Sequence, residues 1–277
     1  MPPFDLTPYR PVALDDLVRV GRAHDGGYVI SRRTVDATRV LVGLGINDDW
    51  SFEEAFVAAN PGVRVVGVDG SVSAQVFRRR AGRHLVGALR GLVRGRRSVL
   101  LTEMRDAVHD HAVARSLSRF FDGRRHHFVP CYFEPSDSPT SVSWPTLAER
   151  FGVLGSGGCD VFLKMDIEGA EYRTLEGVLR DAHRLAGVAI EFHDLDRDWD
   201  RFAALMEALM RTFAVAHLHG NNCVPLIGGT ATPAVLEVSL VNRALLGAEA
   251  RPSTHAYPIP GLDMPNAATL ADYPLAL

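Results

Sequence analysis

Hydrophobic residues along the chain form short, nearly continuous runs that alternate with segments of helical spacing. Runs of this length, rich in β-branched residues, predict buried strands; they lie at 38–43, 63–68, 127–133, 161–163, 187–192, 213–218 and 234–241. Helical spacing predicts a lead-in helix within residues 1–20 and helices over 51–59, 170–179 and 197–211, with Ser51 as an N-cap. Strands alternating with helices, each strand apolar throughout, indicate an α/β fold with a parallel sheet covered on both faces. The last two strands, joined by a loop alone, are expected to form an antiparallel hairpin at one edge.

One segment, residues 74–127, interrupts this alternation with helical spacing and a strong basic bias. It holds 13 arginines against 4 acidic residues, which gives a local charge near +9 and leaves the remainder of the chain near −12. We therefore expect a single domain over 1–277 with an arginine-rich helical insertion, or lid, at about 74–127. Such a surface is either a solvated helical face or a binding surface for an anionic acceptor or partner. Its few aromatic residues argue against nucleic acid, because single-stranded bases need stacking partners.

The composition is that of an ordinary soluble globular protein: 277 residues, 47% hydrophobic, with a net charge of −3. No stretch approaches the roughly 20 apolar residues of a membrane span, and the first residues lack the pattern of a secretory signal. The three cysteines, Cys131, Cys159 and Cys223, are far apart and form no CxxC pair. Reduced thiols in a cytoplasmic protein are therefore expected.

A glycine-rich turn follows the first predicted strand and contains Gly43, Gly45 and Asn47. Asp69 and Gly70 follow the second strand, where an acidic side chain can accept hydrogen bonds from the ribose hydroxyls of an adenosine. The pair suits either a dinucleotide or S-adenosylmethionine. The third glycine of GxGxxG is replaced by an aspartate, and the acidic turn would repel a pyrophosphate at the helix N-terminus, so the pattern favours S-adenosylmethionine.

The segment 159–172, CDVFLKMDIEGAEY, combines a strand, a charged tip, a glycine and a helix start. This is how an α/β protein builds a site at the carboxyl end of a parallel strand. Lys164 is the only lysine in the chain. We expect it to neutralise neighbouring carboxylates, such as Glu171 or Glu191, in preference to contacting a ligand.

The block Lys164-Met165-Asp166-Ile167-Glu168-Gly169-Ala170-Glu171 resembles the signature of FkbM-type methyltransferases. Residues 25–28 (DGGY), 45–48 (GIND) and 51–53 (SFE) resemble blocks of a related methyltransferase group. The resemblance implies a class I, Rossmann-like methyltransferase fold: a mostly parallel seven-stranded sheet whose last strand is antiparallel. It also implies S-adenosylmethionine as the cofactor and a hydroxyl oxygen as the acceptor. The residues expected at the cofactor are Gly43, Gly45, Asn47, Ser51, Asp69, Gly70, Asp166 and Tyr28.

Further ionisable residues should converge with Asp166, because parallel strands end at one edge of the sheet. Glu191 and His193 share a face of one strand, and His219 follows the next. A hydroxyl nucleophile must lose a proton, and a neutral histidine near pH 7 suits that role. We take His193 as the first candidate base and His219 as the second. An alternative is a divalent metal held by Asp166, Glu191, His193 or His219, although their spacing does not define a metal site.

The sequence thus predicts a methyltransferase that acts on a hydroxyl of a sugar or another small natural product, with an anionic acceptor left open. Two other classes stay open. One is a binding or regulatory module that retains the fold and the cofactor without catalysis. The other is a nicotinamide-dependent oxidoreductase, which the missing glycine and the acidic turn disfavour.

Overall fold

A computed structural model describes residues 4–155, 157–247 and 250–277. Its centre is a seven-stranded sheet in the order β10-β11-β9-β8-β3-β4-β5. The strands are β3 (Val40–Leu44), β4 (Arg64–Val68), β5 (His126–Val129), β8 (Val161–Met165), β9 (Leu185–Phe192), β10 (Phe213–Gly220) and β11 (Leu236–Asn242). The first five are parallel, and β11 lies antiparallel between β9 and β10. The expected fold class is therefore confirmed: an α/β, Rossmann-like, mostly parallel seven-stranded sheet with an antiparallel last strand.

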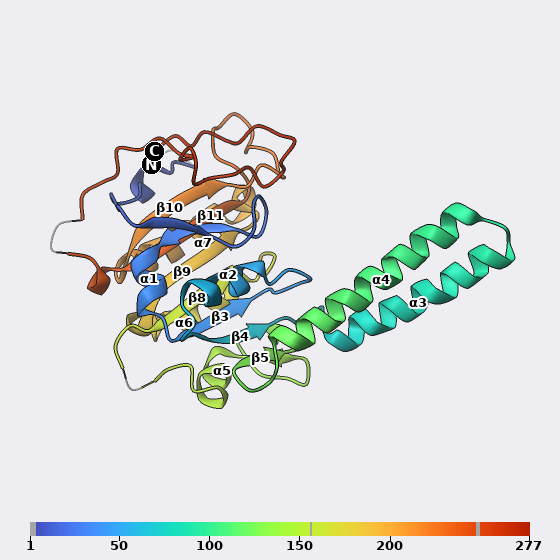
Figure 1. Ribbon diagram of the computed structural model, residues 1–277. Coiled ribbons are helices and arrows are strands. Elements are labelled where there is room, and N and C mark those ends of the chain that lie inside the picture. The colour runs from blue at the N-terminus through green and yellow to red at the C-terminus, as the bar shows by residue number, and fades with distance from the viewer. Residues whose placement is uncertain (1–3, 156, 248–249) are drawn as a thin grey trace.

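Two hydrophobic cores lie on the two faces of this sheet, because successive strand residues point to opposite sides. In β3, Val40 and Val42 belong to one core and Leu41 to the other. The first core is covered by α5 (Trp144–Arg150), α6 (Glu171–Leu179) and α7 (Leu195–Met210). The second is covered by α1 (Arg32–Ala37), α2 (Ser51–Ala59) and the proximal ends of the insertion helices. Figure 1 shows these helices around the sheet.

Two small sheets and three single turns complete the fold. The strands are β1 (Leu17–Val20) with β2 (Tyr28–Ser31), which are antiparallel, and β6 (Tyr132–Phe133) with β7 (Ser141–Val142), which are parallel. The 3₁₀ turns are η1 (Thr7–Tyr9), η2 (Ala182–Arg184) and η3 (Arg243–Leu245). The expected lead-in helix is wrong, because β1 and η1 occupy that region. The strand expected over 127–133 is divided into β5 and β6, with Pro130 between them.

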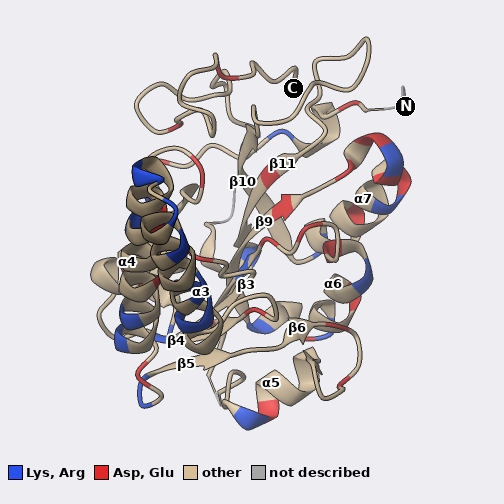
Figure 2. Ribbon diagram, turned by 90° about the vertical axis from the view of Figure 1, so that its right-hand side faces the viewer, with Lys and Arg blue, Asp and Glu red and all other residues tan. Residues whose placement is uncertain are grey.

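The arginine-rich segment forms two long helices, α3 (Ala74–Val93) and α4 (Arg97–Phe120), that pack against each other as an antiparallel hairpin. Figure 1 shows the hairpin extending far from the sheet, and Figure 2 shows its arginines. None of the described helices is both long and apolar enough to cross a membrane.

Candidate functional site

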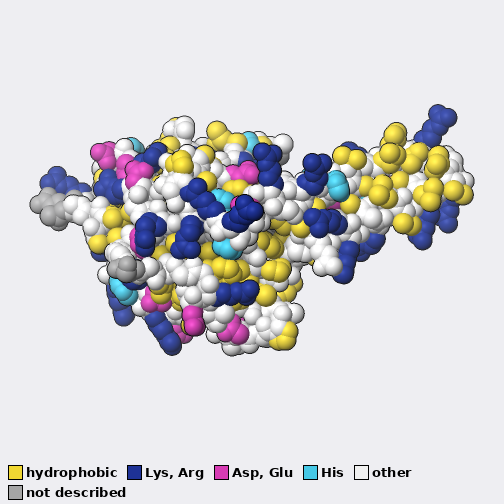
Figure 3. Space-filling view, turned by 60° about the horizontal axis from the view of Figure 1, so that its bottom comes forward, with side chains coloured by type: hydrophobic (Ala, Val, Ile, Leu, Met, Phe, Trp, Pro, Cys, Tyr) yellow, Lys and Arg dark blue, Asp and Glu magenta, His cyan; other side chains and the backbone are white. Residues whose placement is uncertain are grey.

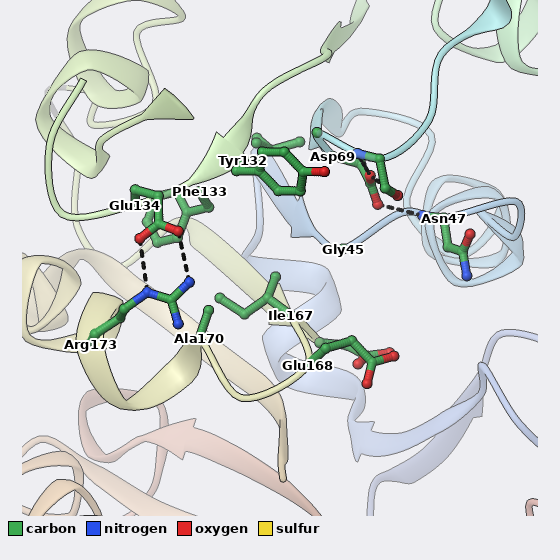
Figure 4. A pocket seen from close by; sticks show the side chains of 14 residues that line it. Gly45, Asn47, Asp69, Tyr132, Phe133, Glu134, Ile167, Glu168, Ala170 and Arg173 are labelled. Atoms are coloured by element: carbon green, nitrogen blue, oxygen red, sulfur yellow. Dashed lines mark hydrogen bonds and ion pairs between the residues drawn. The ribbon is translucent and has the colours of Figure 1, made fainter. Parts of the chain in front are cut away.

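A cavity of about 320 Å³ lies at the carboxyl edge of β3, β4 and β8. Segments that follow these three strands form its walls together with β6 and the start of α6 (Figure 4). The lining residues are Gly45, Asn47, Val68, Asp69, Gly70, Ser71, Tyr132, Phe133, Glu134, Asp166, Ile167, Glu168, Ala170 and Arg173. The structure therefore brings five of the expected residues together at one cavity: Gly45, Asn47, Asp69, Gly70 and Asp166. No residue of α3 or α4 is among these described lining residues, so a lid role would require the hairpin to move.

The turn after β3 is fixed by close backbone packing. Gly45 has a φ of +79°, and a Cβ built there would lie 1.6 Å from the carbonyl oxygen of Asp166. Asn47 also has a positive φ, and its amide donates a 2.8 Å hydrogen bond to Oδ2 of Asp69. The strand ends of β3, β4 and β8 are thereby locked together. Gly43 has a different role: it lies within β3, where the side chain of Glu53 fills the space that a Cβ would need.

Asp69 organises the wall of the cavity next to β4. Its Oδ1 accepts hydrogen bonds from the amide of Ser71 at 2.7 Å and from the Ser71 hydroxyl at 2.6 Å. Gly70 lies against Tyr132, whose ring would be 2.5 Å from an added Cβ. Both carboxylate oxygens of Asp69 thus hold the loop, and the carboxylate still lines the cavity.

The part of the wall that β6 forms next to Gly70 was not expected from the sequence. Tyr132 and Phe133 of β6 line the cavity, and Tyr132 remains 52% exposed although it is a large aromatic residue. Arg173 and Glu134 form a two-pronged ion pair beside them, with N–O distances of 2.9 and 2.7 Å (Figure 4). The only feature of the sequence that could have predicted this aromatic wall is the Tyr-Phe pair directly after a strand. Two adjacent aromatic residues are, however, more often part of a hydrophobic core.

Lys164 lies among carboxylates as expected, with Glu191 acting through its charge, but its nearest carboxylate is Asp166 and not Glu171. Its Nζ lies 2.9 Å from the Gly45 carbonyl oxygen and 3.5 Å from Oδ2 of Asp166. Burial lowers the pKa of Lys164, and the charges of Asp166, Glu53 and Glu191 outweigh that effect and raise it. Glu171 instead accepts a 3.0 Å hydrogen bond from the amide of Ile167.

A smaller hollow of about 100 Å³ lies on the other side of the glycine turn and shares Gly45, Asn47 and Asp166 with the main cavity. An ion pair of 3.0 Å between Arg22 and Asp49 closes one side of it. Arg22 lies just before the DGGY block, so this block packs against the glycine turn.

Besides Gly43, two further expected cofactor residues lie outside the main cavity. Tyr28 is buried in β2, where it packs edge-on against Phe52 and lies 5.9 Å from Nζ of Lys164. Ser51 is the first residue of α2 and not its N-cap. The capping acceptor is Asp49, whose Oδ1 receives the Ser51 amide at 3.0 Å.

His193 lies beside the cavity among carboxylates. Its Nδ1 is 3.2 Å from Oε1 of Glu171, and its Nε2 is 3.6 Å from Glu168 and 3.9 Å from Asp166. Burial lowers the pKa of His193, but the hydrogen bond to Glu171 and the surrounding negative charges raise it to about 9. A raised pKa favours the protonated ring, which runs against the neutral imidazole expected for a base.

Glu191 completes a cluster with two of these residues. Ligand atoms of Asp166, Glu191 and His193 all lie within 4.8 Å of one another, as three metal ligands would. Burial, and then the charges of Asp166 and Glu237, raise the pKa of Glu191 to about 8, and Asn221 donates to it at 2.6 Å. This residue set fits a divalent cation chemically, and His219 is not part of it.

His219 lies away from the cavity, between two carboxylates. Its Nδ1 is 3.1 Å from Glu237 and its Nε2 is 3.0 Å from Asp272, and the side chain is almost fully buried. Burial lowers the pKa of His219, and the two hydrogen bonds raise it to about 10. Both ring nitrogens are engaged, so His219 ties β10 to the C-terminal segment and is not retained as a base.

Comparisons with known proteins gave matches to solved structures only; no protein-family model and no curated protein matches the chain. A precorrin-6y C5,15-methyltransferase from Geobacter metallireducens GS-15 is 11% identical, with a TM-score of 0.35 over 75% of this chain and 84% of that one. The mitomycin 7-O-methyltransferase MmcR is 14% identical, with a TM-score of 0.28 over 76% of this chain and 53% of that one. A DUF574 family protein from Streptomyces avermitilis MA-4680 is 11% identical, with a TM-score of 0.34 over 76% and 80%. These scores are low, and the fold assignment rests on the strand order and strand directions of the chain's own sheet.

Proposed function

We propose that the protein is an S-adenosylmethionine-dependent O-methyltransferase that acts on a small molecule. The observation that carries this proposal is the cavity where Gly45, Asp69 and Asp166 meet at the ends of three parallel strands. Asp69 would hold the ribose, and Tyr132 and Phe133 would contact the adenine. The methionine end would point to the smaller hollow, which offers both charge signs through Arg22 and Asp49.

The position of Asp49 supports S-adenosylmethionine over a nicotinamide dinucleotide. Its carboxylate accepts the Ser51 amide at the N-terminus of α2, the place where a Rossmann protein binds a pyrophosphate. A phosphate would meet a negative charge and a backbone amide that is already engaged. The cofactor proposed here has no phosphate and carries positive charges, which carboxylates attract.

His193 is the proposed base for the acceptor hydroxyl. The cofactor supplies a methyl group bound to a positively charged sulfur. His193 would take the proton of the acceptor hydroxyl on a deprotonated ring nitrogen, with Glu171 holding Nδ1. A nearby positive charge disfavours protonation of a histidine. Cofactor binding would therefore bring the pKa of His193 down from about 9 towards neutrality.

The acceptor is proposed to be a hydroxyl of a sugar or another small natural product. The resemblance of residues 164–171 to FkbM-type enzymes supports it, and this family assignment is part of the proposal. A cytoplasmic location is also part of it, supported by the three unpaired cysteines. The metal alternative is tested separately: loss of turnover with EDTA, restored by Mg²⁺ or Mn²⁺, would assign Asp166, Glu191 and His193 as ligands.

The test compares S-adenosylhomocysteine and NAD by calorimetry, followed by a transfer assay with methyl-labelled cofactor on a panel of hydroxylated acceptors. Binding of S-adenosylhomocysteine but not NAD supports the proposal, and binding of NAD alone overturns it. If the cofactor binds and no hydroxyl compound is labelled while an amine or thiol is, the O-specificity is wrong. The alternative of a non-catalytic module predicts that the cofactor binds and that no acceptor of any class is labelled.

A further inference from the structure

The insertion hairpin carries most of the exposed apolar side chains of the protein. Nine of the thirteen exposed large hydrophobic residues in the described part of the chain lie on α3 or α4. They are Leu85, Val86, Leu89, Leu92, Val93, Val99, Leu101, Met104 and Val108. A contiguous apolar patch of this kind on a globular protein marks an interaction surface. Figure 3 shows hydrophobic side chains gathered on the distal part of the hairpin.

The distribution of side-chain size within the hairpin is inverted relative to an ordinary helix pair. Along the distal half, the residues buried between the two helices are small: Ala88, Gly91 and Ala107. The large side chains face solvent instead; Leu89 is 61% exposed and Leu101 is 68% exposed. Two helices with this pattern have little core of their own, and their large residues become a core only when a further layer covers them.

Six of the nine exposed residues form one face of the hairpin. On α3 they follow the spacing of Leu85, Leu89 and Leu92, and on α4 the spacing of Leu101, Met104 and Val108. Each helix has a second stripe, which contacts the other helix. Around the axis of each helix, the exposed apolar stripe is rotated from that contact stripe by about a quarter to a third of a turn. Viewed from the N-terminus, the rotation has the same direction in α3 and in α4. Because α3 and α4 are antiparallel, rotations in the same sense bring both stripes to the same side of the hairpin.

We propose that this face pairs with the same face of a second copy of the chain, so that two hairpins form a four-helix bundle about a twofold axis. The helices are about 30 and 36 Å long and about 10 Å wide each, so one whole face of the hairpin covers ~600 Å² per copy. Two copies would bury ~1,200 Å² together, which reaches the lower limit of stable protein interfaces. An isologous contact of this kind closes on itself and leaves no apolar face exposed.

The charges of the hairpin are compatible with such a pair. Arg79, Arg83 and Arg90 follow another side of α3, so face-to-face packing leaves them in solvent. Arg97 lies in line with the apolar stripe of α4, one turn before Leu101, and Arg105 borders the stripe; both would repel the basic side chains of the second copy. Salt screens that repulsion and does not weaken apolar burial. Dimerisation should therefore strengthen with ionic strength, whereas binding of an anionic surface through the same arginines would weaken.

Gly82 gives a second indication of close helix packing. It lies on the apolar side of α3, and nothing is within 4 Å of the place where its Cβ would be. A glycine in an exposed helix costs stability relative to alanine. A partner helix that packs against its bare backbone would provide the reason for it.

The experiment is sedimentation velocity of the full chain at low and high salt, over concentrations from nanomolar to tens of micromolar. The wild type should be a dimer that tightens at high salt. Leu89→Asp should be a monomer with an unchanged monomer melting profile, because Leu89 is exposed in the isolated chain. Two controls should stay dimeric: Arg83→Asp, on another side of the same helix, and Leu270→Asp, which is 54% exposed but outside the hairpin.

A wild type that is monomeric at every concentration would overturn the proposal, and so would a Leu89→Asp variant that still dimerises. The arginines could instead favour an anionic membrane surface, and flotation with phosphatidylglycerol vesicles tests for that binding. A monomer that binds these vesicles at low salt and releases them at high salt would assign the face to a membrane surface instead. The readouts involve neither cofactor nor acceptor, so their outcome is independent of the proposed enzymatic function.

Discussion

Gly45 lies directly against the backbone carbonyl of Asp166, so closely that the two strand ends could not meet if residue 45 carried a side chain. A Cβ on Gly45 would lie 1.6 Å from this oxygen, and the φ of Gly45 is +79°. The amide of Gly45 also donates to the carbonyl of Val68 at 3.0 Å, and its own carbonyl accepts from Lys164 at 2.9 Å. Three strands are thus joined at one glycine, which lines both hollows of the candidate site.

Gly45→Ala should therefore lower the free energy of unfolding by about 1–3 kcal/mol, the range for a residue forced into strained backbone geometry. It should also weaken binding of S-adenosylhomocysteine, because the turn must move away from Asp166. Denaturant unfolding and calorimetry measure the two effects. Gly177→Ala is the control: Gly177 lies in α6 with open space around its Cβ, so this change should be neutral or slightly stabilising. Equal behaviour of the two variants would contradict the role given to Gly45.

Asp69 connects cofactor binding to the stability of the loop. Asp69→Ala removes the acceptor for the amides of Asn47 and Ser71, so we expect a loss of about 1–3 kcal/mol in unfolding free energy as well as weaker S-adenosylhomocysteine binding. Asp69→Asn keeps one carbonyl acceptor and should lose less stability. Thermal melts and calorimetry on both variants provide the comparison. An alanine variant that melts normally but does not bind the cofactor would show that the loop needs no support from Asp69.

The sequence was sufficient for the parts of the fold that depend on local pattern. Buried parallel strands require apolar residues on both faces, so β3, β4, β8 and β9 appear as nearly continuous apolar runs. Once the strands are known, the position of their carboxyl ends is known too, because parallel strands end at one edge of the sheet. Gly45, Asp69 and Asp166 could therefore be placed at a common site from the pattern of strands alone.

Contacts between distant segments could not be read from local pattern. Tyr28 was expected at the cofactor, but the β1–β2 hairpin buries it against Phe52. His219 has the residue type of a base, yet the C-terminal segment supplies Asp272 and encloses it. The partners in both cases come from parts of the chain whose position no periodicity specifies. The size inversion in α3 and α4 is likewise invisible until the two inward stripes are known.

The pair of carboxylates around His219 should make it a structural residue of large effect. His219→Ala would leave Glu237 and Asp272 buried without their shared cation, and such losses typically cost about 3–5 kcal/mol. Limited proteolysis should then cut within residues 250–277 faster than in the wild type. His109→Ala, an exposed position on α4, is the control and should change neither measurement. If His219→Ala kept full stability and lost turnover, His219 would return as a candidate base.

The protonation of His193 gives the most direct test of the proposed chemistry. Its ring resonances in NMR should titrate near pH 9 in the free protein, far above the ordinary value of about 6.5. Because the folded pKa is the higher one, the stabilisation is fully present below about pH 6.5 and is lost as the pH rises through about 9.

Glu171→Gln should move that titration towards neutrality, because it removes the charge beside Nδ1, whereas Glu176→Gln on the exposed side of α6 should not. S-adenosylmethionine, whose sulfonium is cationic, should lower the pKa of His193 more than S-adenosylhomocysteine, whose sulfur is neutral. If the pKa of His193 were the same with the two ligands, the charge of the sulfonium would have no effect on His193. The histidine would then belong to the carboxylate cluster as a structural cation, and the acceptor proton would have to leave by another route.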